Sequence, residues 1–161
     1  MAGTNGNNGG ASHLAWLRSR HDALTADRHL DYEVPGYDGR LVLRFGPVPW
    51  SAIAKTQALA SRDDRDGRAL ATANMDVLIA ACREVMFRDD AGELGSVDPS
   101  GEAHGLDAEL GALLGQEFTT ARAALRWFFR NEDVAIAVAA GEVLTWTQRM
   151  DAETSDAFVG E

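Results

Sequence analysis

The sequence predicts a single domain of the α+β class that is predominantly helical, with about five or six helices and one or two small β-hairpins. Three observations lead to this prediction. Apolar residues recur at helical spacing in several segments, and two short stretches alternate apolar and other residues around glycine-containing turns. The chain has 161 residues, of which 45% are hydrophobic, so one domain can bury a core without disulfides or metal.

The first expected element is a helix that begins at Ser12, a possible N-cap, and ends before the first strand. Trp16 lies off its apolar line and is a possible exposed anchor. Residues 1–11 are mainly Gly and Asn, which bury little on folding, so they are expected to form a disordered leader. The apolar line consists of Leu14, Leu17, His21 and Leu24.

A hairpin is expected next. Residues 30–34 and 41–45 alternate in hydrophobicity, and Pro35-Gly36-Tyr37-Asp38-Gly39 between them supplies a fixed φ and two glycines. Two prolines then end the second strand, and Pro49 at an early helical position predicts a helix to about Ser61. The polar residues 62–67 are expected to form a loop.

The rest of the chain reads as helices around one further turn. Arg68 to Met86 holds the strongest helical stripe, and Asp89-Asp90-Ala91-Gly92 predicts a second small hairpin over 87–97. Further helices are expected over 106–114, over a segment capped by Thr119 or Thr120, and over 132–149. The predicted organisation is therefore a disordered leader (1–11), one mostly helical domain (12–149) and an acidic flexible tail (150–161).

The charge of the chain limits its partners. The formal net charge is −10, and the acidity is concentrated: residues 87–117 carry eight acidic and one basic residue, while residues 1–86 are balanced. Nucleic acids and anionic membranes are bound by clustered Lys and Arg, so neither is an expected partner. The first residues do not resemble a signal peptide, and no apolar run approaches the roughly 18 residues of a membrane span. The expected location is therefore the cytoplasm.

No catalytic motif is present in the sequence. There is no phosphate-binding glycine loop, no G-x-S-x-G and no H-E-x-x-H. The single cysteine, Cys82, excludes an internal disulfide and is expected in mid-helix next to the apolar stripe, as a buried, inert thiol. The four histidines show no metal-ligand spacing. We therefore expect no enzyme activity, no cofactor and no metal.

Large aromatic residues and a basic stripe are the candidates for partner contact. Trp50 and Trp127 are unusually large for their surroundings, and each is a candidate anchor if exposed. Arg122, Arg126 and Arg130 follow at i, i+4 and i+8, which places a basic stripe on one helix face of an acidic chain. A solvated face is the plainest interpretation of these arginines, and docking of an acidic surface is the more specific one.

Six features follow one another along the chain: the hairpin 32–41, the Trp50 helix, Leu78-Ile79-Ala80-Ala81-Cys82, the turn 88–94, Leu113-Leu114-Gly115 and the closing Val143-Leu144-x-Trp146 helix. Their order resembles the tail assembly chaperones of long-tailed phages (siphoviruses) of actinobacteria. The resemblance covers about Leu30 to Gln148. It implies a small, mostly helical, non-catalytic protein that binds the tape measure protein during tail assembly, keeps it soluble and is absent from the finished tail. The tail tube protein and a second copy of this chain are further candidate partners.

Other classes of protein remain open at this point. The main alternative is a structural virion protein, such as a head-tail connector or a strand-rich tail tube subunit. A small enzyme with an unfamiliar site is a third class, which a pocket with clustered carboxylates would support. An adaptor or immunity-type binding protein is a fourth.

Overall fold

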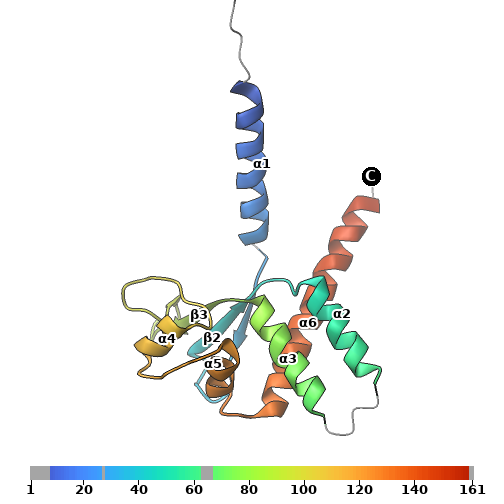
Figure 1. Cartoon of the computed structure of the whole chain (residues 1–161). Helices are drawn as coiled ribbons and strands as arrows, with labels where there is room; N and C mark the ends of the chain where they lie inside the picture. Colours follow the sequence, from blue (N-terminus) through green and yellow to red (C-terminus); the bar gives the residue numbers. More distant parts are fainter. Residues whose placement is uncertain (1–7, 27, 63–66, 160–161) are drawn as a thin grey trace, which may run out of the picture.

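The computed structural model of the protein describes residues 8–26, 28–62 and 67–159. These residues form six helices and a four-stranded antiparallel sheet, so the predicted α+β, predominantly helical class is confirmed (Figure 1). Within them, no helix has both the length and the apolar character needed to cross a membrane. In chain order the elements are α1 (Asn8–Ala26), β1 (Leu30–Glu33), β2 (Leu41–Phe45), α2 (Trp50–Ala60), α3 (Arg68–Ala81), β3 (Cys82–Arg88), β4 (Leu94–Ser96), α4 (Ala108–Leu113), α5 (Ala121–Phe128) and α6 (Asp133–Val159).

The sheet joins two hairpins. β1 pairs with β2 around the predicted turn, β3 pairs with β4, and β2 pairs with β3 although α2 and α3 separate them in the chain. The strand order is therefore β1-β2-β3-β4. Leu41, Leu43 and Phe45 alternate along β2 and enter the core, as the period of two in a strand requires.

The expected helix from Arg68 to Met86 is confirmed as far as Ala81 and is wrong over its last five residues, 82–86. α3 ends at Ala81, Cys82 already has extended backbone (φ −66°, ψ 123°), and the chain continues directly as β3. The spacing of Val77, Ala81 and Val85 fits a helix, but Val85 pairs with Leu43 of β2 instead. Pairing with the free edge of β2 satisfies both backbones, and this tertiary interaction outweighs the local helical pattern.

The first and last helices are longer than expected. α1 already includes residues 8–11 of the expected leader, and α6 continues past Arg149 to Val159. Residues 142–159 contain no Gly or Pro, so nothing in the local sequence ends the helix near Arg149. Residues 1–7, residues 160–161 and part of the expected loop 62–67 lie outside the described residues.

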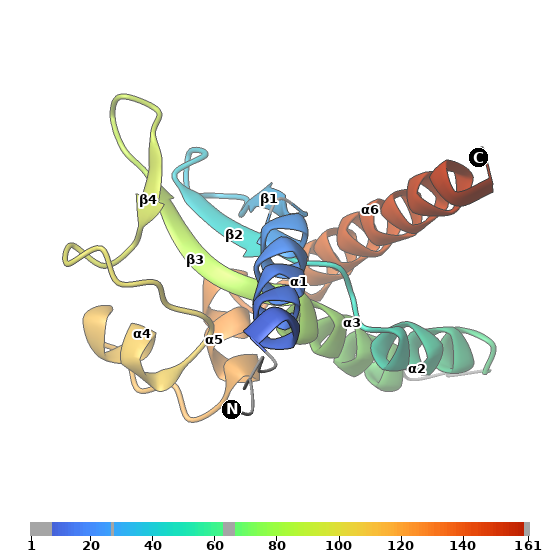
Figure 2. The same ribbon diagram turned by 90° about the horizontal axis from the view of Figure 1, so that it is seen from above.

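The core lies between the sheet and the helices α2, α3, α5 and α6, and Leu110 of α4 joins it. α3 is central: it packs against α2, α5 and α6, and it lies between α2 and α5 in both views (Figures 1 and 2). The few buried polar groups are satisfied. The Thr147 hydroxyl accepts from the backbone N–H of Val48 at 3.1 Å and donates to the Val143 carbonyl at 2.9 Å, which ties α6 to the segment before α2.

α1 is separate from this core. It projects away from the body of the molecule, and its described side chains from Ser12 to Leu24 are all exposed (Figure 1). An isolated helix of this length is only marginally stable in water, since most helical stability comes from packing an apolar face. α1 therefore presents apolar side chains that the fold itself does not use.

Candidate functional site

The two candidate tryptophans occupy separate places. Trp50 begins α2 directly after Pro49 and is 72% exposed. Trp127 lies near the end of α5, is 38% exposed, and packs edge-on against Phe128 with 5.2 Å between ring centroids. Because α3 lies between α2 and α5, the structure does not join the two tryptophans into one surface (Figures 1 and 2).

Trp127 lines an apolar groove of about 240 Å³. The groove combines residues from both hairpins with the end of α4 and with α5, so distant segments of the chain build it. Phe87, which is 40% exposed, forms one wall of the groove. It was not a candidate from the sequence, because no feature of the neighbouring residues shows that this strand residue faces solvent. The lining consists of Tyr37, Arg40, Leu41, Phe87, Val97, Leu114, Trp127 and Phe128.

The groove has one charged residue in its lining, Arg40. Its guanidinium pairs with Asp90 and lies 5.9 Å from the centroid of the Phe87 ring. The carboxylate of Asp90, in the turn of the second hairpin, thus holds the Arg40 guanidinium against the Phe87 ring at the wall of the groove. Such a groove suits an apolar side chain of a partner better than an anionic ligand.

The three arginines do not form one stripe. α5 ends at Phe128, and Arg130 follows it with φ +52°, so Arg130 leaves the helix that carries Arg122 and Arg126. All three have partners within the chain. The Arg122 guanidinium donates to Asp76 at 2.6 Å, and that of Arg126 to Asp133 at 3.2 Å.

Asp76 connects three helices. It accepts from Lys55 of α2 at 2.9 Å and from Arg122 of α5, while lying on α3 itself. Burial alone would raise the pKa of Asp76, but the hydrogen bonds from Arg122 and Lys55 outweigh it and lower that pKa. Arg122 therefore contributes to helix packing as well as to the surface.

Arg130 holds the turn of the first hairpin. Its Nη1 donates to the Pro35 carbonyl at 2.6 Å, its Nη2 lies 3.2 Å from the Glu132 carboxylate, and its guanidinium is 5.9 Å from the Tyr37 ring centroid. The Tyr37 hydroxyl in turn donates to the Phe128 carbonyl at 3.0 Å. These contacts dock the turn onto the end of α5.

Among the residues whose exposure the structure describes, α1 carries more large exposed apolar side chains than any other element. Leu14, Trp16 and Leu17 are 58%, 64% and 55% exposed, and Leu24 is 48% exposed. The sequence marked Leu14, Leu17 and Leu24 as one face and Trp16 as a possible anchor. Large exposed apolar side chains grouped on one element mark interaction surfaces in folded proteins.

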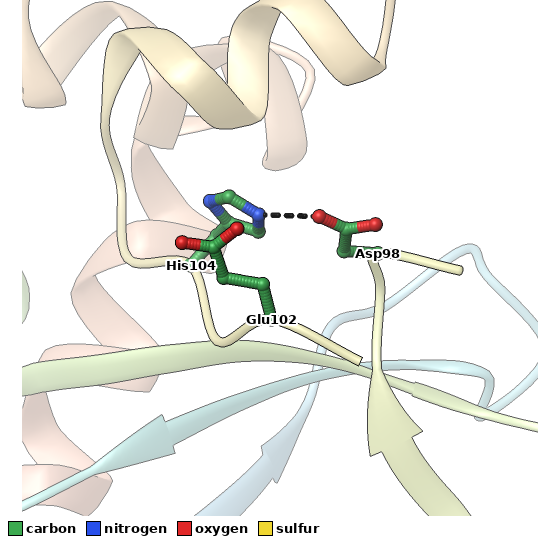
Figure 3. Close-up of side chains that lie close together, drawn as sticks. All are labelled: Asp98, Glu102 and His104. Carbon is green, nitrogen blue, oxygen red and sulfur yellow. Dashed lines mark hydrogen bonds and ion pairs between the residues drawn. The ribbon is translucent and has the colours of Figure 1, made fainter. Parts of the chain in front are cut away.

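A second kind of site was missed by the sequence reasoning. Asp98, Glu102 and His104 follow β4 in a tight loop, and their ligand atoms all lie within 4.8 Å of one another (Figure 3). His104 Nε2 lies 2.8 Å from Asp98 Oδ2, and the imidazole is buried. This hydrogen bond raises the pKa of His104 and lowers that of Asp98. The only sequence signal was the run D-x-x-x-E-x-H, which matches no established motif.

Cys82 is a poor candidate for chemistry. It sits at the junction of α3 and β3 rather than inside a helix, and burial raises the pKa of its thiol to about 12. Since the thiolate is the reactive form, the thiol is inert near neutral pH.

No protein-family model, curated protein or solved structure matches this chain.

Proposed function

We propose that this protein binds another protein rather than catalysing a reaction. In its specific form, the proposal is a phage tail assembly chaperone that holds the tape measure protein in solution in the host cytoplasm. The observation that supports binding is α1, whose Leu14, Trp16 and Leu17 are each more than half exposed on a helix that projects from the body. The tape measure as the partner rests on the resemblance given above.

The chemistry of α1 suits a helical, partly apolar partner. A second amphipathic helix laid along α1 buries both apolar faces, and it replaces the tertiary packing that α1 does not receive from its own domain. The groove at Trp127 offers a place for one further apolar side chain. The net charge of −10 favours solubility of the complex by repulsion between copies.

The other candidate residues have different parts in this proposal. Trp50 is the most exposed tryptophan of the described residues and is available as a separate contact. Arg122 and Arg126 can contact the partner only if its carboxylates join or replace Asp76 and Asp133. Arg130 holds the turn of the first hairpin through its hydrogen bond to the Pro35 carbonyl.

Co-expression with the neighbouring tape measure gene tests the function. We expect the tape measure protein to be soluble with this chain and to aggregate without it. An equal soluble fraction in both cultures would refute the chaperone function. A purified complex then allows the contact surface to be tested with variants.

The decisive variant is Leu14→Ser combined with Leu17→Ser. Anchor residues of an interface typically contribute more than about 1–2 kcal/mol each, so affinity should fall at least tenfold. The matched control is Val134→Ser with Val138→Ser, which removes two side chains of α6 that are 77% and 52% exposed. The role of α1 would be contradicted if both double variants lowered the affinity for the tape measure protein equally, or if neither variant lowered it.

The alternative is a structural virion protein such as a head-tail connector or tail tube subunit. The predominance of helices and the small sheet speak against a strand-rich tube subunit. Mass spectrometry of purified virions separates the two proposals, since an assembly chaperone is expected to be missing from the finished particle and a structural subunit is expected to be present in many copies.

A further inference from the structure

We propose that Asp98, Glu102 and His104 form a binding site for a divalent transition-metal ion, of which Zn²⁺ is the best match. This inference is independent of the protein-binding function. It starts from the convergence of one imidazole nitrogen and two carboxylates, which come from seven consecutive residues of the loop between β4 and α4 (Figure 3).

The distances between the ligand atoms suit one shared ion. Zn²⁺ binds nitrogen and oxygen ligands at about 2.0–2.2 Å, so two ligands of a tetrahedral ion lie roughly 3.3–3.5 Å apart. His104 Nε2 and Asp98 Oδ2 are 2.8 Å apart, and all three ligand atoms are within 4.8 Å of one another. Shifts of about an ångström in side chains, above all in the exposed Glu102, complete the geometry.

The charges around His104 also favour a cation. Asp98 approaches Nε2, the Glu109 carboxylate lies 3.9 Å from Nδ1, and Glu102 completes the cluster. Three carboxylates thus surround one imidazole, which supplies at most a single positive charge. A divalent ion at Nε2 takes the place of the proton shared with Asp98 and neutralises the excess negative charge, and the imidazole hydrogen then lies on Nδ1, the nitrogen nearest the Glu109 carboxylate.

The ligands are held in place by the fold. His104 is 5% exposed, and its backbone carbonyl accepts from the N–H of Val85 in β3 at 2.7 Å. One oxygen of Asp98, Oδ1, accepts from the N–H of Ser100 at 2.8 Å, so the other faces the imidazole. The Ser96 hydroxyl bonds the Glu102 carbonyl and closes the loop. A buried nitrogen ligand on a strand-anchored backbone distinguishes this cluster from ordinary surface acids.

The nature of the ligands selects the metal. Ca²⁺ takes six to eight oxygen ligands, which this cluster does not supply, whereas imidazole together with carboxylates suits Zn²⁺ and related transition metals. Three protein ligands leave a coordination position for water. The competing possibility is that Asp98 and His104 only stabilise the loop through their hydrogen bond.

Titration calorimetry on the full chain, freed of metal and carrying no histidine tag, tests the site with ZnCl₂ and CaCl₂. We expect one Zn²⁺ per chain, a higher melting temperature with Zn²⁺, and no response to CaCl₂. Glu102→Gln leaves the hydrogen bond between His104 and Asp98 intact and should weaken Zn²⁺ binding at least tenfold. Even the loss of a residue that only supports a metal ligand typically lowers metal affinity about 10–100-fold.

His104→Gln should abolish the binding, and Glu93→Gln, which removes the same charge from the neighbouring hairpin, should leave it unchanged. Circular dichroism checks that each variant is folded. The proposal is overturned if Zn²⁺ does not bind at one equivalent, if Glu102→Gln binds as wild type does, or if Ca²⁺ binds as tightly as Zn²⁺.

Discussion

Arg130 is a candidate partner contact that the structure ties to the fold, and its replacement by alanine measures which role it has. We expect Arg130→Ala to lower the free energy of unfolding by about 1–2 kcal/mol. The charge-assisted hydrogen bond to Pro35 would contribute about 1.5–3 kcal/mol if shielded, but the side chain is 42% exposed, which reduces it to about 1 kcal/mol. The Glu132 pair and the Tyr37 ring add at most about 1 kcal/mol.

Gly36 provides a second variant that acts on the same contact. A Cβ at Gly36 would lie 2.5 Å from Arg130 Nη1, and its φ is +90°. Gly36→Ala should therefore cost about 1–2 kcal/mol of backbone strain and about 1 kcal/mol more by displacing the guanidinium. Because Arg130→Ala has already lost that hydrogen bond, the double variant should be about 1 kcal/mol more stable than the sum of the single effects predicts.

Urea unfolding followed by circular dichroism measures this cycle, and melting temperatures should change by about 2–4 °C for each kcal/mol. Arg126→Ala, which removes an exposed pair with Asp133, is the matched control; it should cost less than about 0.5 kcal/mol and combine additively with Gly36→Ala. The reasoning fails if Arg130→Ala is as stable as wild type or if its effect is additive with Gly36→Ala. Arg130 would then be available for a partner.

Three further predictions concern the stability and reactivity of the domain. The hydrogen bond from Arg44 lowers the pKa of Asp31 below its ordinary 3.8, so this stabilisation is complete above about pH 5 and is lost as the pH falls through the folded-state pKa. Asp31→Asn should thus cost about 1 kcal/mol at pH 7, with the difference from wild type shrinking in urea titrations at acid pH. Leu78 is completely buried, and Leu78→Ala should cost about 2–5 kcal/mol in the same titration; a value below 1 kcal/mol would mean that α3 is not central to the core. The Cys82 thiol, with a pKa of about 12, should react with a thiol reagent at pH 8 only after urea is added, so rapid modification of the native protein would contradict its burial.

Elements with strong local signals could be predicted from the sequence. The turn after Pro35 carries residues with positive φ at Gly36, Asp38 and Gly39, and the hairpin forms where this turn chemistry places it. Thr120 caps α5 as expected, its hydroxyl accepting from the N–H of Ala123 at 3.1 Å. In both cases, a few neighbouring residues determine the conformation.

Features that depend on distant residues could not be predicted in this way. The first five residues of β3 were predicted as helix, because the pairing of β3 with β2 is decided by the sheet and not by the spacing of Val85. Arg130 does not lie in one stripe with Arg122 and Arg126, because it donates a hydrogen bond to Pro35, which is far away in the sequence. His104 has no motif around it, and its approach to Asp98 follows from the path of the loop after β4.

The lengths of the outer strands limit how copies of this chain can associate. The sheet ends on one side with β1, of four residues, and on the other with β4, of three. A neighbouring chain adding to either edge would find room for only a short ladder of hydrogen bonds, and short edge strands are a common protection against such aggregation. Self-association, if it occurs at high concentration in the cell, should therefore proceed through helices and leave the sheet of each copy unextended.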